Sequence, residues 1–78
     1  MAKHPRSVRQ IPNRLKDIRR MKAVKQIDLS IEAGVSVNTI SSIESHDYFP
    51  TAQVRKRICK ALGVEHEAIW RNVSVGNE

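Results

Sequence analysis

The sequence predicts an all-α fold, a small helical bundle organised around two short helices that meet at a tight corner, and three observations favour it. The chain has 78 residues, enough for one domain with a modest core. It contains one Trp, one Tyr and one Phe, so Ile, Val, Leu and Ala must fill that core. Apolar residues also recur at helical spacing on both sides of a break at residues 34–36, namely Leu29, Ala33, Ile40 and Ile43.

Positive charge is concentrated at the N-terminal end of the chain. The formal net charge is +6; residues 1–25 hold nine Lys or Arg against one Asp, net +8, whereas residues 26–78 are net −2. This distribution favours an anionic partner. Residues 1–11 contain Pro5 and lack apolar periodicity, so we expect a flexible basic arm. Such an arm either contacts nucleic acid or is simply a disordered terminus.

The first helix is expected over residues 13–22. Asn13 follows Pro12 and is a suitable N-cap, because its side-chain oxygen can accept a backbone N–H of the first turn. Ile11, Leu15 and Ile18 would form its inner stripe.

The second and third helices form the predicted corner. Lys25 and Gln26 open the second helix, and Gly34 ends it, because glycine adopts the left-handed conformation of a helix C-cap without strain. Ser36 can then cap a third helix over about residues 37–45. The outward face of this third helix carries short, uncharged side chains where a solvated helix would carry Lys, Glu or Arg: Asn38, Ser41, Ser42 and Ser45, with Val37 and Thr39 at its entrance.

A fourth helix is expected from Ala52 to Leu62, with Thr51 as N-cap and Gly63 at its end. Its inner face would hold Val54, Ile58, Ala61 and Leu62, and its outer side Arg55, Lys56, Arg57 and Lys60. A short fifth helix over about residues 65–70 should close the core through Ile69 and Trp70. The folded domain is thus expected over residues 12–72, with a C-terminal tail over 73–78 in which Val73 and Val75 either pair across a dimer or fray.

Several function classes are disfavoured by composition. Cys59 is the single cysteine, and the three histidines lack metal-ligand spacing, so we expect no disulfide and no metal site. No catalytic constellation is visible, so neither an enzyme nor a cofactor is expected. The chain shows no signal peptide and no run long enough to cross a bilayer, so a cytoplasmic protein without membrane contact is expected.

The ordered motifs of this chain resemble the lambda-repressor-like, Cro/XRE-type helix-turn-helix family. The family pattern of a Gln opening the second helix, then A-G-V-S, then T-I-S-x-I-E, is similar to Gln26, residues 33–36 and residues 39–44. The closing pattern of a Pro, A-L-G-V and an apolar pair is similar to Pro50, residues 61–64 and residues 69–70. The resemblance spans residues 15–70 and implies a five-helix lambda-repressor-like bundle that binds double-stranded DNA.

The resemblance also implies roles for individual residues. It assigns base-edge contacts to Val37, Asn38 and Ser42, although Val37 could instead turn inward and pack. It implies that Arg19 pairs with Glu44 and pins the third helix onto the first; the alternative is two exposed charges without a shared role. Contacts to the DNA backbone are expected from the start of the second helix and from the third helix and its following loop: Lys25, Gln26, Thr39, Ser41, Ser45 and His46.

The function expected from these residues is that of a prokaryotic or phage-type transcriptional regulator, repressor-like and nucleoid-associated, which binds a pseudo-palindromic operator as a homodimer. Two alternatives stay open. The same module could serve as an antitoxin that also binds a protein partner. A small basic helical adaptor could instead bind an acidic protein or RNA, and it would show no preference for a duplex sequence.

Overall fold

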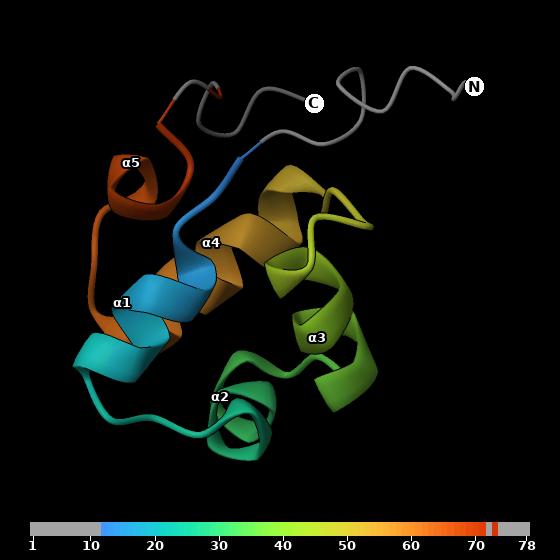
Figure 1. Cartoon of the computed structure of the whole chain (residues 1–78), viewed down its shortest axis with the longest axis vertical. Helices are drawn as coiled ribbons and strands as arrows, with labels where there is room; N and C mark the ends of the chain where they lie inside the picture. The colour runs from blue at the N-terminus through green and yellow to red at the C-terminus, as the bar shows by residue number, and fades with distance from the viewer. Residues whose placement is uncertain (1–11, 72, 74–78) are drawn as a thin grey trace.

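The computed structural model describes residues 12–71 and 73, and this part of the chain folds into five helices (Figure 1). The all-α fold class expected from the sequence is confirmed. The expected basic arm over residues 1–11 and the possible strand residue Val75 lie outside the described residues. The helices are α1 (Leu15–Met21), α2 (Gln26–Ala33), α3 (Val37–Glu44), α4 (Ala52–Leu62) and α5 (His66–Ile69).

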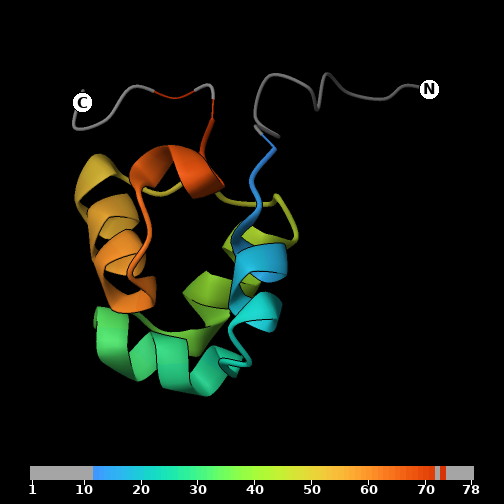
Figure 2. The ribbon, with the colours of Figure 1, turned by 90° about the vertical axis from the view of Figure 1, so that its left-hand side faces the viewer.

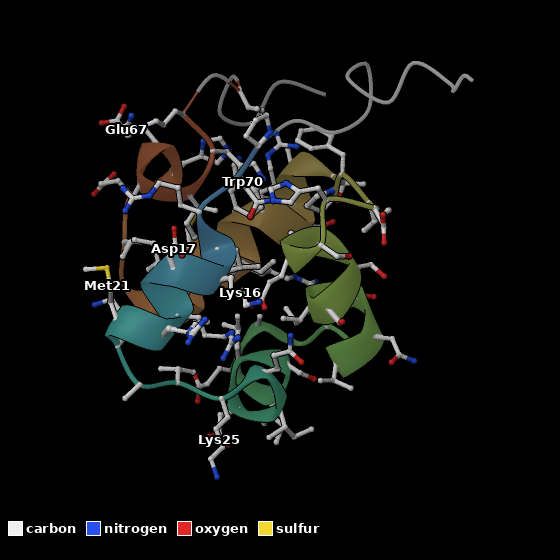
Figure 3. The ribbon with its side chains drawn as sticks, in the orientation of Figure 1. Lys16, Asp17, Met21, Lys25, Glu67 and Trp70 are labelled. Carbon is white, nitrogen blue, oxygen red and sulfur yellow. The ribbon has the colours of Figure 1, made fainter. Side chains whose placement is uncertain are left out.

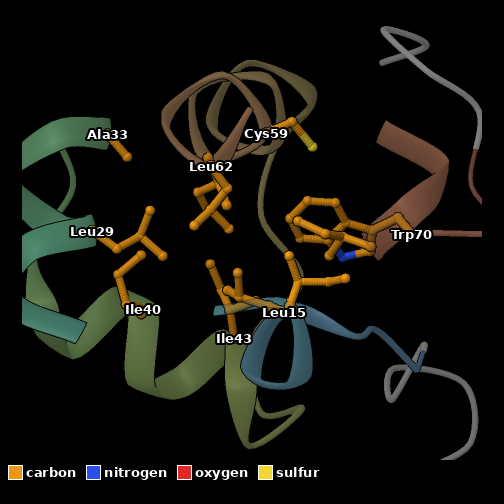
Figure 4. Packing of buried hydrophobic residues seen from close by; sticks show 11 residues of the cluster. Leu15, Leu29, Ala33, Ile40, Ile43, Cys59, Leu62 and Trp70 are labelled. Atoms are coloured by element: carbon orange, nitrogen blue, oxygen red, sulfur yellow. The ribbon is translucent and has the colours of Figure 1, made fainter. Parts of the chain in front are cut away.

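The helices enclose one hydrophobic core. Helix α2 packs on both α3 and α4, and it crosses one end of the molecule while α5 lies toward the other (Figure 2). Figure 4 shows Ala33 and Leu29 at one side of the core and Trp70 at the other. The core uses the aliphatic residues that the composition required, with Trp70 as its one large aromatic: Leu15, Ile18, Leu29, Ala33, Ile40, Ile43, Ile58, Cys59, Leu62, Ile69 and Trp70.

Most helix ends follow local rules. Gly34 and Gly63 adopt left-handed conformations, with φ of 73° and 70°, at the ends of α2 and α4. Ser36 and Thr51 accept the N–H groups of Thr39 and Val54 through their hydroxyls. The caps expected at these four positions are therefore all present.

The start of α1 differs from the expectation by two residues. The helix begins at Leu15, and the Asn13 side chain still serves its first turn, since Oδ1 accepts the Leu15 N–H at 3.0 Å. Nδ2 of the same Asn13 side chain donates to the carbonyl of Ile43 at 3.0 Å. Asn13 therefore joins the start of α1 to α3, and this contact with a residue distant in sequence holds it outside the helix.

The position of Arg55 corrects the expectation that it faces outward with its basic neighbours. Arg55 is only 1% exposed. Its guanidinium donates to the Pro50 carbonyl at 2.8 Å and to His66 Nε2 at 3.0 Å, and it lies 4.8 Å from the centre of the Phe49 ring. A buried charge is tolerated when its donors are satisfied in this way. Arg55 therefore connects α4, α5 and the loop after α3.

The C-terminal residues that the structure describes belong to the bundle. Helix α5 is shorter than expected, since Glu65 and Trp70 are its caps, yet Ile69 and Trp70 are fully buried as expected. Val73, which we assigned to a separate tail, is half-buried and packs against the core. Among the described residues, no helix has both the length and the hydropathy needed to cross a membrane.

Candidate nucleic-acid interface

Helix α3 presents one apolar and one polar face. Ile40 and Ile43 are fully buried, so the opposite face is fixed toward solvent. Asn38 and Ser41 are exposed on that face, and Ser42 is half-exposed. The only charged residue of α3, Glu44, is buried. The exposed surface of the helix therefore offers short hydrogen-bonding side chains without charge.

Asn38 has the side chain best suited to recognising a base. Within the described part of the chain, its amide forms no hydrogen bond, so both the donor and the acceptor face solvent. An amide in this state can bond an adenine edge through two hydrogen bonds. Val37, next to it, is half-buried and is not part of the core cluster, so its apolar surface remains beside Asn38.

Glu44 is the centre of a buried polar cluster that joins three helices. Its carboxylate accepts Arg19 Nε at 2.6 Å, Arg19 Nη2 at 3.1 Å and Gln26 Nε2 at 3.0 Å. Arg19 also donates to the Val24 carbonyl at 2.8 Å. The structure thus brings together the two residues expected to pair, and it adds Gln26 to them. The cluster sets the orientation of α3 relative to α1 and α2.

The start of α2 provides a cationic and a polar group beside exposed backbone N–H groups. Lys25 is its N-cap and points away from the bundle (Figure 3). Gln26 is half-buried by its bond to Glu44, a position that the sequence did not indicate. The positive end of the helix dipole makes this terminus favourable for a phosphate group.

The remaining residues expected at the DNA backbone lie at the two ends of α3. Thr39 forms a 2.9 Å hydrogen bond between its hydroxyl and that of Ser36, at the N-terminal end. At the C-terminal end, the Ser45 hydroxyl donates to Asp47 Oδ2 at 3.0 Å, and His46 adopts φ of 66°. The left-handed His46 ends the helix, since the Asp47 N–H returns to the Ser42 carbonyl at 2.9 Å.

A hollow in the polar face involves a residue that we did not place in the site from sequence. It measures about 280 Å³ and is lined by Asn38, Thr39, Ser42 and Tyr48. Tyr48 is 44% exposed and comes from the loop after α3. Its aromatic side chain, in a loop that immediately follows the polar helix, was the available signal in the sequence.

Helices α2 and α3 are joined by a tight turn, and Gln26 on α2 bonds Glu44 on α3. The outward face of α3 is polar and uncharged. This arrangement defines a helix-turn-helix protein. Comparison with known proteins agrees with this class. The HTH_3 family model, described as Helix-turn-helix, matches residues 15–69. The chain belongs to this family.

Two relatives support the assignment. The chain is 31% identical over 58 residues to a protein of Bacillus subtilis (strain 168) named as the uncharacterized HTH-type transcriptional regulator YgzD, and the match covers 74% of this chain and 88% of that protein. It is also similar to the crystal structure of an HTH_3 family transcriptional regulator from Vibrio cholerae, with a TM-score of 0.69 and 27% identity. That match covers 77% of this chain but only 34% of the Vibrio cholerae chain, so the present chain spans about a third of the length of that relative.

Proposed function

We propose that this protein is a sequence-specific transcriptional regulator that places α3 in the major groove of double-stranded DNA. The observation that carries the proposal is the outward face of α3, where Asn38 has an unbonded amide and every exposed side chain is uncharged. A helix in the major groove must reach base edges with side chains that form specific hydrogen bonds. Membership of the helix-turn-helix family and the names of both relatives support the same function.

In this proposal, base edges are read by Val37, Asn38 and Ser42. The Asn38 amide would bond an adenine, Val37 would contact a thymine methyl group, and the Ser42 hydroxyl can bond either a donor or an acceptor. These chemistries favour an A·T-rich half-site.

Contacts to phosphate would set the register of α3 in the groove. Lys25 supplies charge at the start of α2. The side-chain nitrogen of Gln26 carries two N–H groups, so one can donate to a phosphate oxygen while the other donates to Glu44. Gln26 can also bind phosphate through its backbone N–H in the unpaired first turn. The other proposed phosphate contacts come from the ends of α3, at Thr39, Ser41, Ser45 and His46.

We further propose that two copies bind a pseudo-palindromic operator. A homodimer would place one α3 helix in each of two major-groove segments about 34–36 Å apart. Two half-sites also make specific binding far stronger than a single short α3 contact would allow.

Two substitutions separate base reading from phosphate binding. Asn38→Ala should weaken operator binding by about 1–3 kcal/mol and relax the preference at one base position of each half-site. Lys25→Ala should weaken binding to all duplexes and reduce the slope of log K against log salt by about 1. Fluorescence anisotropy titrations at several salt concentrations distinguish the two patterns. Equal loss of affinity on operator and random duplex with Asn38→Ala would remove Asn38 from the reading face.

A further inference from the structure

The hollow beside Asn38 has walls from two segments of the chain. Asn38, Thr39 and Ser42 belong to α3, and Tyr48 belongs to the loop that follows it. None of these four residues is a Lys, Arg, His, Asp or Glu. The hollow therefore lies on the face that we propose enters the major groove, yet it lacks the cation that would make a phosphate its natural ligand.

The Thr39 wall is fixed by the cap of α3. Its hydroxyl lies 2.9 Å from the Ser36 hydroxyl, and its backbone N–H donates to the same Ser36 oxygen at 3.1 Å. A threonine carries one hydroxyl and one methyl on Cβ, and binding the hydroxyl holds χ1 in one rotamer. With the hydroxyl held in this way, the Thr39 methyl also has a defined position, and it is the apolar group that Thr39 offers to a ligand.

The Tyr48 wall is held from both sides of the loop. Before it, His46 is fixed in the left-handed conformation by the hydrogen bonds that end α3. After it, Pro50 is buried, and its carbonyl accepts the Arg55 guanidinium at 2.8 Å. These two contacts, at His46 and Pro50, hold the backbone of the loop on either side of Tyr48.

We propose that this hollow receives the 5-methyl group of a thymine, at the base pair read by Asn38 or at its immediate neighbour. In the major groove, the adenine edge of an A·T pair lies beside the thymine O4 and the thymine methyl. An α3 helix that bonds adenine through Asn38 therefore brings a thymine methyl next to its own apolar surfaces. The Thr39 methyl and the Tyr48 ring offer that methyl apolar contacts beside Asn38. This inference rests on the proposed function, and it adds Tyr48 and the methyl of Thr39 to the groups that determine specificity.

The test removes one methyl at a time from each side of the contact. Once the preferred operator is known, each thymine is replaced singly by deoxyuridine, which lacks only the 5-methyl group and keeps the base pair. Thr39→Ser removes the methyl of the protein and keeps the hydroxyl that bonds Ser36. Thr51→Ser is the matched control, because it removes a threonine methyl at the N-cap of α4, and Thr51 does not line the hollow.

We expect one thymine in each half-site at which deoxyuridine lowers the affinity of the wild type about fourfold, the value of one buried methyl. The ratio of the affinity for the thymine operator to the affinity for the deoxyuridine operator should fall toward one in Thr39→Ser. The same ratio should be unchanged in Thr51→Ser. Tyr48→Phe should also preserve the ratio, because the ring and not the hydroxyl forms the wall.

Three other results each have a distinct meaning. If deoxyuridine and Thr39→Ser act additively at every position, the hollow does not hold a thymine methyl. If Tyr48→Phe weakens binding equally on thymine and deoxyuridine operators while the ratio is insensitive to Thr39→Ser, Tyr48 binds phosphate and the inference is overturned. If no operator can be selected at all, the proposed function fails, and the methyl pocket fails with it.

Discussion

Arg55 and His66 form a buried contact in which only one protonation state is favourable. Arg55 Nε donates to His66 Nε2 at 3.0 Å, so that nitrogen must be unprotonated, and His66 is 8% exposed. Burial lowers the pKa of His66 below its usual 6.5, and the Arg55 charge and that of Lys56 lower it further, while Glu67 opposes them. The centre of the Trp70 ring lies 5.6 Å from the centre of the His66 ring, and this neighbour carries no charge. Protonation of His66 would bring a second cation against Arg55.

This contact predicts that the protein loses stability in mild acid. The pKa of His66 is lower in the folded state than in the unfolded chain, so the unfolded state binds the proton first, and stability falls as pH drops through about 6.5 toward the folded pKa. Urea unfolding between about pH 7.5 and about pH 5.5 should show a decline in the wild type that is reduced in His66→Gln. His46→Gln leaves the contact with Arg55 intact and should retain the decline. An identical decline in His66→Gln and wild type would contradict this assignment.

The burial of Arg55 could not be predicted from its immediate neighbours in the sequence. Its neighbours Lys56 and Arg57 are exposed, and a charged side chain in that sequence is usually solvated. The residues that satisfy Arg55, at Pro50 and His66, could not be identified before the loop and α5 were placed.

Cys59 lies in the hydrophobic core, where its small side chain packs as an apolar group. It is 6% exposed, and burial raises the pKa of its thiol to about 11. The thiolate is therefore scarce near neutral pH, and the folded protein holds Cys59 in an unreactive form.

At the scale of the helices, Glu44 determines how α3 is held. Its carboxylate accepts three N–H groups, two from Arg19 on α1 and one from Gln26 on α2. The Glu44 side chain is 4% exposed and that of Arg19 is 12% exposed, so solvent screens the pair little. Such a pair contributes less net stability than its geometry suggests, because both charges are desolvated. Its clearer effect is to fix the angle at which the polar face of α3 is presented.

Removing one member of this cluster should therefore lower the free energy of unfolding. Glu44→Ala leaves the Arg19 guanidinium buried without its carboxylate, and we expect a loss of about 3 kcal/mol in the free energy of unfolding. The double variant Arg19→Ala with Glu44→Ala should lose less than the sum of the two single variants, since neither charge remains buried and unpaired. Chemical denaturation of the four proteins measures this coupling. Strict additivity would show that the two side chains are energetically independent.

Helix boundaries were predictable where a local rule determines them. Ser36, Gly34, Thr51 and Gly63 cap their helices as expected, because capping involves residues within one turn. The ends of α1 and α3 were less predictable. Ala23 and His46 take the left-handed conformation there, with φ of 57° and 66°, where a sequence pattern would require glycine.

At the scale of the whole molecule, the candidate site combines features that are visible in sequence with others that depend on packing. The uncharged face of α3 could be identified from residue types and spacing. The hollow could not, because Tyr48 and Thr39 are brought together only by the turn after α3. The same holds for Gln26, whose bond to Glu44 joins residues that lie 18 positions apart.

Charge and shape point to the same kind of ligand. The chain carries a formal net charge of +6, which favours association with a polyanion at low salt whatever its sequence. The polar face of α3 contributes nothing to that charge, since its exposed residues are neutral. Affinity and specificity should therefore come from different residues, as the contrast between Lys25→Ala and Asn38→Ala is designed to show.

The central claim is that α3 reads a DNA sequence, and selection from a randomised duplex library tests it most directly. The purified protein and its Asn38→Ala variant would be used in parallel at near-physiological salt, where non-specific binding to phosphate is weakened. We expect the wild type to enrich a motif of two inverted half-sites rich in A·T, and Asn38→Ala to lose the preference at one position in each half-site. Failure of the wild type to enrich any duplex sequence would contradict the claim and would favour a protein or RNA as the partner of the basic surface.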